Sequence, residues 1–215
     1  MRAAGRIICD RFFAVGALSD FLWRSFREEV VDLLDGDKED ESDDQEINGG
    51  EMQLENQALK LIALQQPVAS DFRTIVSVLK ASSDLERIGD HAVSIAKETI
   101  LVKGNQRVPQ IEEKISAMTA DIRKMLEQVL DAYVKADEKS ARNIAQEDKK
   151  LDEQYKVCRN LIVKEMQHET KTAVATSSYL LVARLLERIG DHIVNLSEWI
   201  VYSKNGHLVE LNDKQ

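Results

Sequence analysis

One seven-residue segment, Leu-Glu-Arg-Ile-Gly-Asp-His, occurs twice in this chain, at residues 85–91 and 186–192. We call it the signature. An unbroken match of this length, repeated after 101 residues (85 to 186), indicates an internal repeat. A weaker acidic echo precedes each copy, DDQEIN at 43–48 and EDKKLD at 147–152. Because echo and signature follow in the same order in both halves, the sequence predicts two copies of one structural unit.

Composition and periodicity predict that this unit is helical. The chain has only 2 Pro and 5% aromatic residues, while helix-forming residues are plentiful. Apolar side chains recur at spacings of three and four. Pro67 suits the first turn of a helix, Asp137 suits an N-cap, and Gly206 suits a helix end. The expected helices span residues 6–34, 43–65, 67–101, 111–135, 138–168 and 172–202.

A loop rich in turn-forming residues separates the two copies. Residues 103–110, KGNQRVPQ, combine Gly, Asn and Pro. The sequence therefore predicts a first domain over 1–104 and a second over 110–207. Three antiparallel helices joined by short loops make a bundle. We expect an all-α fold of two tandem three-helix bundles related by the internal repeat.

Charge and cysteine content limit the partners and the location. The net charge is −9, and an acidic surface repels phosphate backbones, so nucleic-acid binding is not expected. Cys9 and Cys158 lie far apart and belong to no metal-binding spacing, which fits a reducing compartment. No apolar run approaches the roughly 20 residues of a membrane-spanning helix. These features predict a cytoplasmic protein.

The signature places two carboxylates on one side of its helix. Glu86 and Asp90 are four residues apart, as are Glu187 and Asp191, so each pair shares a helix face. The apolar stripe around the first pair consists of Leu85, Ile88, Ala92 and Ile95. At about 100° per residue, the carboxylates point away from that stripe. We therefore expect both pairs on the exterior of their bundles.

The signature also carries energetic costs that appear twice. Like charges at this spacing oppose helix formation by about 0.2–0.5 kcal/mol. Gly89 and Gly190 each add about 1 kcal/mol relative to Ala, and a glycine lets a neighbouring chain approach closely. Bound cations would offset these costs, because hard and borderline cations prefer clustered carboxylates.

The acidic echoes extend this cation hypothesis to the preceding helices. Asp148 and Asp152 form another pair four residues apart, and Asp44 with Asn48 is the counterpart in the first half. Two neighbouring helices could thus supply the ligands of one multinuclear metal centre. The candidate ligands are Asp44, Glu86, Asp90, Asp148, Asp152, Glu187 and Asp191.

The same residues fit a second interpretation, in which they form surface ion pairs. Arg184 is three residues from Glu187, and Arg87 is three residues from both Asp84 and Asp90. Exposed pairs of this kind contribute less than about 1 kcal/mol. The residues alone do not decide between the two interpretations, a cation site or a set of surface ion pairs.

Enzymatic activity is not predicted. A carboxylate-bridged di-iron enzyme needs two Glu-x-x-His elements and two further glutamates that face the bundle interior. This chain has one clear element of that kind, Glu165 to His168, and His91 stands five residues from Glu86. The P-loop, GxSxG and zinc-protease motifs do not occur in the sequence.

The segments at 61–98 and 185–206, which contain the two signatures, closely resemble the PhoU family of bacterial phosphate-transport regulatory proteins. The resemblance extends over roughly residues 43–212 and implies two three-helix bundles. The family's Glu/Asp-x-x-x-Asp motif falls on Glu86 and Asp90 and on Glu187 and Asp191. Two features depart from the family pattern: Asn48 in the first echo, and the atypical residues 1–42.

The resemblance implies regulation rather than catalysis. It implies a protein that represses phosphate uptake and the phosphate-starvation response, together with the phosphate ABC transporter and a membrane sensor kinase. Homodimers or larger oligomers are expected, with contact to the membrane only through partners. The resemblance further implies iron, zinc or other divalent cations at the acidic motifs. The alternative is a metal-binding helical scaffold without a role in phosphate regulation.

Overall fold

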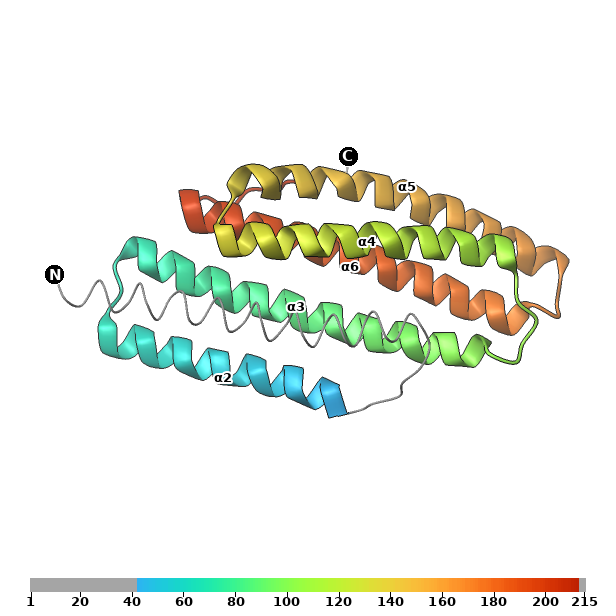
Figure 1. Ribbon diagram of the computed structural model, residues 1–215, viewed down its shortest axis with the longest axis horizontal. Helices are drawn as coiled ribbons and strands as arrows, with labels where there is room; N and C mark the ends of the chain where they lie inside the picture. The colour runs from blue at the N-terminus through green and yellow to red at the C-terminus, as the bar shows by residue number, and fades with distance from the viewer. Residues whose placement is uncertain (1–41, 213–215) are drawn as a thin grey trace.

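The structure, a computed structural model, describes residues 42–212 of the chain (Figure 1). Five helices lie in this range, and none of these residues belongs to a β-strand. They are α2 Ser42–Gln65, α3 Ala69–Val102, α4 Pro109–Lys135, α5 Glu138–His168 and α6 Ala173–Asn205. The all-α prediction is confirmed, while the helix expected at 6–34 lies outside the described residues. None of the described helices combines the length and apolarity needed to cross a membrane.

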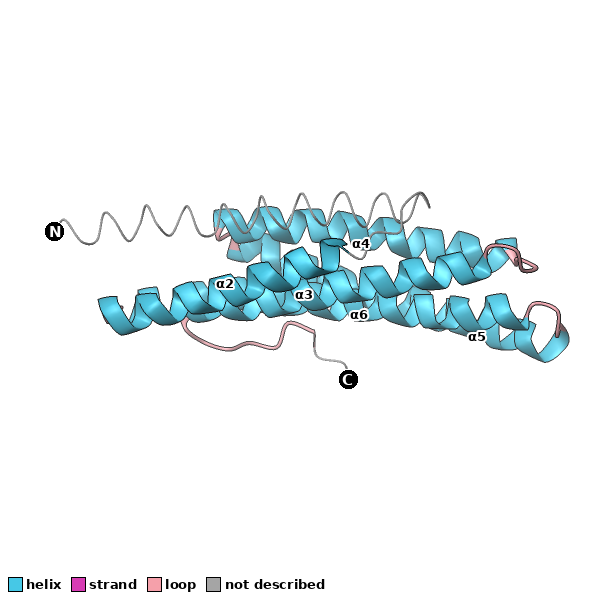
Figure 2. Ribbon diagram, turned by 90° about the horizontal axis from the view of Figure 1, so that it is seen from below, coloured by secondary structure: helices cyan, strands magenta, loops and turns pink. Residues whose placement is uncertain are grey.

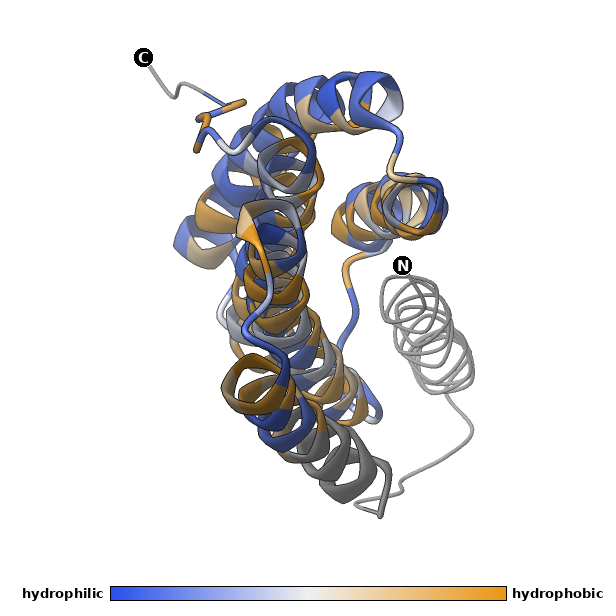
Figure 3. Cartoon of the chain, turned by 90° about the vertical axis from the view of Figure 1, so that its left-hand side faces the viewer, coloured by the Kyte–Doolittle hydropathy of each residue, from blue (hydrophilic) through white to orange (hydrophobic). Residues whose placement is uncertain are grey.

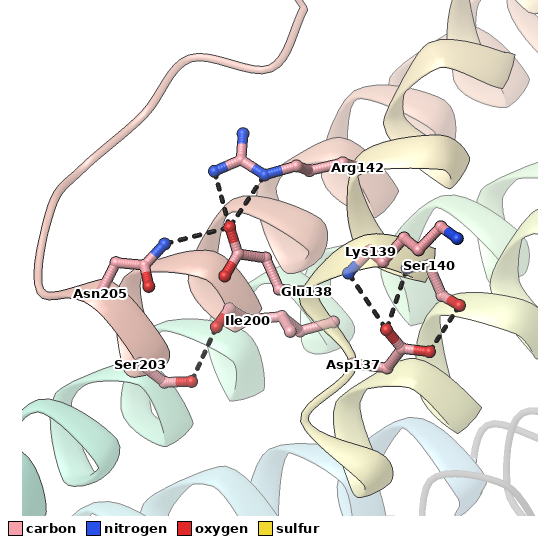
Figure 4. Close-up of polar contacts among 8 residues, drawn as sticks. All are labelled: Asp137, Glu138, Lys139, Ser140, Arg142, Ile200, Ser203 and Asn205. Atoms are coloured by element: carbon pink, nitrogen blue, oxygen red, sulfur yellow. Dashed lines mark hydrogen bonds and ion pairs between the residues drawn. The ribbon is translucent and has the colours of Figure 1, made fainter.

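The helix ends follow from local chemistry. Asp137 caps α5, because its Oδ1 accepts hydrogen bonds from the backbone N–H groups of Lys139 and Ser140 at 3.0 and 3.1 Å (Figure 4). Gly206 ends α6 with φ at 74°, a left-handed conformation that glycine adopts without strain. Pro67 precedes α3 instead of opening it, since the helix begins two residues later at Ala69.

The second copy of the repeat is a three-helix bundle. Helices α4, α5 and α6 all pack against one another. Their amphipathic character is visible along the helices in Figure 3, where hydrophobic and hydrophilic residues occur on each helix. The interior of the bundle is filled by large side chains with little or no solvent exposure: Met118, Met125, Val129, Leu151, Cys158, Ile162, Ile193 and Ile200.

The most extensive contact between any two described helices joins the two copies. It lies between α3 and α6, which each carry one signature. They run antiparallel, because Ser77 contacts Trp199 whereas Asp84, further along α3, contacts the earlier residue His192. Helix α2 packs against α3 at the outer side of this pair (Figure 1). The two signatures therefore sit on the two helices that hold the copies together.

Candidate functional site

Gly190 is the residue at which the signature of α6 meets the acidic echo of α5. A Cβ atom on Gly190 would lie 2.5 Å from Oδ1 of Asp148 and closer still to Cδ2 of Leu151. Asp148 itself has no solvent exposure. Real Cβ atoms do not approach other atoms this closely, so the glycine is what allows the Asp148 carboxylate to rest on the signature helix. The expected close approach occurs, but the partners are side chains rather than backbone.

The structure corrects the expected position of one signature carboxylate. Asp90 is exposed, as predicted, and Glu86 and Asp191 are half-buried. Glu187, however, is only 7% exposed, so the prediction that it lies on the exterior of the bundle is wrong. The reason is that α6 contacts α3, α4 and α5 at once, which leaves little of its circumference open to solvent.

The carboxylates of this region are engaged by other side chains. Oε2 of Glu187 accepts a hydrogen bond from Nη1 of Arg184 at 2.7 Å, the ion pair that the second interpretation of the sequence anticipated. The guanidinium carbon of Arg184 also lies 5.8 Å from the centroid of the Tyr155 ring. Oδ2 of Asp148 accepts a hydrogen bond from the side-chain amide of Asn212.

These residues do not fit a metal ion in the arrangement that they adopt. Among the side chains that the structure describes, no three His, Cys, Asp or Glu residues are grouped so that they could hold one. The sequence hypothesis of a multinuclear iron or zinc centre therefore stays a prediction. It rests on Glu86, Asp90, Asp148, Asp152, Glu187 and Asp191, while the side chains of Asp44 and Asn48 lie outside the described set.

Asp84 is the buried polar centre between the two copies. Its Oδ1 lies 2.9 Å from Nδ1 of His192 and accepts a hydrogen bond from Nδ2 of Asn195 at 2.9 Å. Its Oδ2 accepts a hydrogen bond from Nε1 of Trp199 at 3.1 Å. Three donors from α6 thus converge on one carboxylate that is 9% exposed. Because buried polar groups need partners, this cluster fixes how α3 docks on α6.

The sequence analysis did not predict that Asp84 joins the two copies, although the sequence contains an indication of it. The residue before each signature differs between the copies: Asp84 in the first and Leu185 in the second. The two copies differ at this position, where one has a charged residue and the other an apolar residue. Such a difference indicates that the position has different surroundings in the two copies. Trp199 of α6 supplies one of the three donors.

The signature histidines meet at the same interface. The ring centroids of His91 and His192 are 5.5 Å apart, with the ring planes tilted by 42°. Burial lowers the pKa of His91 to about 4, and His192, Arg188 and Arg87 reinforce this effect. His91 is therefore neutral at neutral pH, and it acts as a packing residue of the α3–α6 contact.

The connection between the copies is held by a second polar cluster. Arg107 forms a bidentate pair with Glu112, with N···O distances of 2.6 and 2.8 Å. The Tyr179 hydroxyl donates a hydrogen bond to the same carboxylate and accepts one from the N–H of Val108 at 3.5 Å. Burial, together with the neighbouring Glu112, raises the pKa of Tyr179 to about 12. The loop that precedes α4 is thus fastened to α6.

Comparison with known proteins identifies the family. The PhoU domain matches the chain twice, over residues 24–99 and 115–200. The chain belongs to the PhoU family. Each match contains one copy of the signature, so the predicted tandem repeat is confirmed. The first match begins at residue 24, which is earlier than the start near residue 43 that the sequence motifs indicated.

Curated PhoU relatives cover most of the chain. The phosphate-specific transport system accessory protein PhoU homolog of Streptococcus pneumoniae (strain TIGR4) is 37% identical over 169 residues, which is 79% of this chain and 78% of the relative. The protein with the same description from Clostridium acetobutylicum is 36% identical over 168 residues, or 78% of this chain and 76% of the relative. The descriptions present these relatives as accessory proteins.

Solved PhoU structures share the fold. The crystal structure of PhoU from Pseudomonas aeruginosa superimposes with a TM-score of 0.84 at 29% identity, covering 94% of this chain and 99% of that one. The phosphate transport system regulatory protein PhoU from Streptococcus pneumoniae superimposes with a TM-score of 0.75 at 27% identity, covering 95% and 96%. The predicted tandem three-helix architecture agrees with these structures.

Proposed function

We propose that this protein is a regulator of phosphate homeostasis that represses phosphate uptake and the phosphate-starvation response when phosphate is abundant. The observation that carries the proposal is the double PhoU-domain match, in which each match spans one signature. Relatives at 36–37% identity are described as accessory proteins of phosphate-specific transport. We expect the protein to act by contact with the phosphate ABC transporter and its sensor kinase, without catalysis of its own.

The geometry of the signatures supports an adaptor that works through its surface. Each signature has buried residues that hold α3 and α6 together, such as Ile88 and Ile189. Each also has an exposed arginine, Arg87 or Arg188. Each signature thus contributes buried residues to the contact between the copies and an exposed positive charge to the surface. We propose that these exposed charges belong to the surface that recognises the transporter or the kinase.

A genetic experiment tests the regulatory proposal. Deletion of the gene should raise phosphate uptake and the expression of starvation genes during growth in abundant phosphate. Complementation with the wild-type chain should restore repression, while an Arg87→Ala, Arg188→Ala variant should restore it less well. A Lys139→Ala, Lys164→Ala variant, altered at two exposed positions of α5, is the matched control. Unchanged uptake and expression after deletion would contradict the proposal.

The partners and the assembly state are tested separately. We propose a cytoplasmic homodimer or larger homo-oligomer that reaches the membrane only through its partners. Light scattering on the purified chain gives the oligomer mass. A pull-down from membranes with and without added phosphate should recover the transporter and the kinase in a phosphate-dependent way. Recovery of neither protein under either condition would argue against the proposed partners.

A second candidate is a metal-binding helical scaffold without a role in phosphate regulation, and it rests on the repeated acidic pairs of the sequence. Elemental analysis of protein purified without chelator or affinity tag tests it. The comparison variant replaces the four signature carboxylates, Glu86, Asp90, Glu187 and Asp191, with Ala. Equal metal content in the wild type and the variant would exclude these residues as ligands. A scaffold of this kind would also leave phosphate regulation unchanged after deletion.

A further inference from the structure

Helices α3 and α6 run side by side along the molecule (Figure 2), and the first half of α6 is open to solvent only along a narrow stripe. Over residues 174–190, every residue outside this stripe is buried or half-buried. The exposed residues, which we call the α6 stripe, are Val174, Ser177, Leu181, Arg184 and Arg188. Their alternating spacings of three and four residues put them on one side of the helix, the arrangement with which helices pack against other helices.

The adjoining part of α3 continues the open side. Because α3 and α6 are antiparallel and the signatures meet, residues 87–101 of α3 run beside residues 174–188 of α6. Arg87 and Arg188 hold matched positions in the two signatures. Two copies of one helix that pack antiparallel are related by an approximate two-fold axis, which places matched residues on the same side of the contact. We call the α6 stripe and three exposed residues of α3 the α3–α6 face; the three residues are Arg87, Lys97 and Leu101.

This face is basic, although the chain has a net charge of −9. Of the four signature carboxylates, only that of Asp90 belongs to an exposed residue, whereas both signature arginines are exposed. The exposed charged residues of the two segments are Arg87, Lys97, Arg184 and Arg188, which are basic, and Asp90, which is acidic. A basic area on an acidic protein attracts a negatively charged partner and orients it.

The apolar residues of the face lie at one end of it. Val174, Leu181 and Leu101 are 51%, 44% and 56% exposed, and they lie toward the start of α6 and the end of α3. The arginines lie nearer the middle of the same two helices. Ser177 separates the two apolar side chains of α6, and its small side chain permits close packing of another helix. The face therefore fits a partner that is apolar at one end and negatively charged at the other.

We propose that the α3–α6 face binds an acidic amphipathic helix of a partner protein, an inference that rests on the adaptor function proposed above and adds the chemistry of the partner. The bound helix lays apolar side chains on Val174 and Leu181 and directs carboxylates to Arg184, Arg188 and Arg87. Apolar anchors at helical spacing supply affinity in recognition of this kind, and opposite charges set the orientation.

An anionic membrane surface is the other class of partner that combines negative charge with apolar groups. The shape of the α6 stripe favours a helix. The stripe has one exposed residue at each turn, and the residues on both sides of it are buried or half-buried. Helices that lie on lipid present a wide apolar side flanked by basic residues. A seam as narrow as this one matches a single helix.

The test measures binding of a synthetic peptide to the purified full chain by fluorescence anisotropy. The probe is a labelled helical peptide of about three heptads, with Leu on one side and Glu on both flanks. A matched peptide carries Lys in place of every Glu. The wild-type protein should bind the Glu peptide at least about tenfold more tightly than the Lys peptide, and the difference should shrink as salt is added, because ions screen exposed charges.

Two variants separate the charged from the apolar part of the face. Arg87→Glu, Arg188→Glu should weaken binding of the Glu peptide about tenfold or more and strengthen binding of the Lys peptide. Leu181→Gln should weaken binding of both peptides about fivefold, because it removes an apolar anchor. Lys139→Glu, Lys164→Glu, at two exposed positions of α5, is the matched control and should bind as the wild type does. Circular dichroism confirms that each variant is folded.

Three results would overturn the proposal. One is equal affinity of the wild type for the two peptides, including no binding of either. Another is equal weakening by the reversal at the signatures and by the control reversal. The third is cosedimentation with vesicles of equal parts phosphatidylglycerol and phosphatidylcholine that Arg87→Glu, Arg188→Glu abolishes, which would assign the face to lipid. The genetic deletion test is separate: loss of repression without peptide binding would refute this inference alone, whereas unchanged uptake and expression would refute the proposed function.

Discussion

Asp84 of α3 and His192 of α6 join the two copies of the repeat through a contact that the repeat does not duplicate. The matched positions, 101 residues away in each direction, are Leu185 and His91. His192 therefore has a carboxylate 2.9 Å from its Nδ1, whereas Nε2 of His91 is buried with no hydrogen-bond partner among the described residues. Two histidines that are identical in the sequence motif have different electrostatic environments in the fold.

Replacing Asp84 with Ala should destabilise the protein by about 2–4 kcal/mol, because the buried donor of His192 and two partly buried donors would lose their acceptor. Equilibrium unfolding in urea, followed by circular dichroism, measures this loss. Asp131→Ala is the control, since Asp131 pairs with Lys135 on the solvent face of α4 and its removal should change stability by less than about 0.5 kcal/mol. A similar, small effect for both variants would mean that the Asp84 cluster does not hold the copies together.

Acidification should weaken the fold through His91. Its pKa is lowered from 6.5 to about 4 by burial and by His192 and the two signature arginines. Between these values the unfolded chain binds a proton that the folded chain does not, so stability falls as pH decreases from about 6.5 to about 4. After a discount for partial exposure, the loss between pH 7 and pH 5 is about 1 kcal/mol.

Urea midpoints at pH 7 and pH 5 measure this loss, and His91→Gln should show a smaller decrease than the wild type. His168→Gln, at the exposed end of α5, should follow the wild type. An NMR titration gives the pKa of His91 directly. A value near 6.5 would contradict the electrostatic environment described for this residue.

The helices were largely predictable from sequence because their signals are local. The bounds of α5, Glu138–His168, coincide with the prediction, and Asp137 and Gly206 act as expected at helix ends. The prediction that Asp148 on α5 lies next to the signature was also confirmed. It came from the order of echo and signature, which is the same in both halves of the chain. Apolar periodicity and capping depend on neighbours within a few residues, which a sequence displays directly.

The contacts between copies could not be derived in the same way. The burial of Glu187 depends on how many helices touch α6, and the role of Asp84 depends on which residues of the second copy face it. Nothing in the periodicity of a single helix carries that information. The contacts of the non-helical segment at 207–212 were missed for a related reason: a short segment of this kind has no periodic pattern, and Leu211 bonds to Gln146 and Glu198, which are remote in sequence.

Cys158 should be unreactive in the folded protein. It is fully buried, and burial raises the pKa of its thiol to about 11. At pH 8 the thiolate fraction falls about 100-fold relative to a thiol with the ordinary pKa of 9. Labelling with a thiol reagent should therefore be slow in buffer and fast in urea. The measurement requires a Cys9→Ser background, and fast labelling of the folded chain would contradict the burial of Cys158.

Gly190→Ala should destabilise the protein even though Ala is the better helix former. Propensity alone would favour Ala by about 1 kcal/mol, whereas overpacking a core usually costs about 1–3 kcal/mol. The added Cβ would meet Asp148 and Leu151, and both are buried side chains with little space to move. Overpacking should therefore prevail, with a net loss of about 1–2 kcal/mol in urea unfolding.

Two further variants distinguish overpacking from a general effect of mutation. Ser116→Ala, on the exposed face of α4, should be neutral or slightly stabilising. Leu151→Ala shortens one of the two side chains that the new methyl group would meet, so the double variant with Gly190→Ala should lose less stability than the sum of the single variants. Additive losses of stability would show that the new methyl group does not meet Leu151. They would contradict the conclusion that the missing side chain of Gly190 allows the acidic echo of α5 to contact the signature.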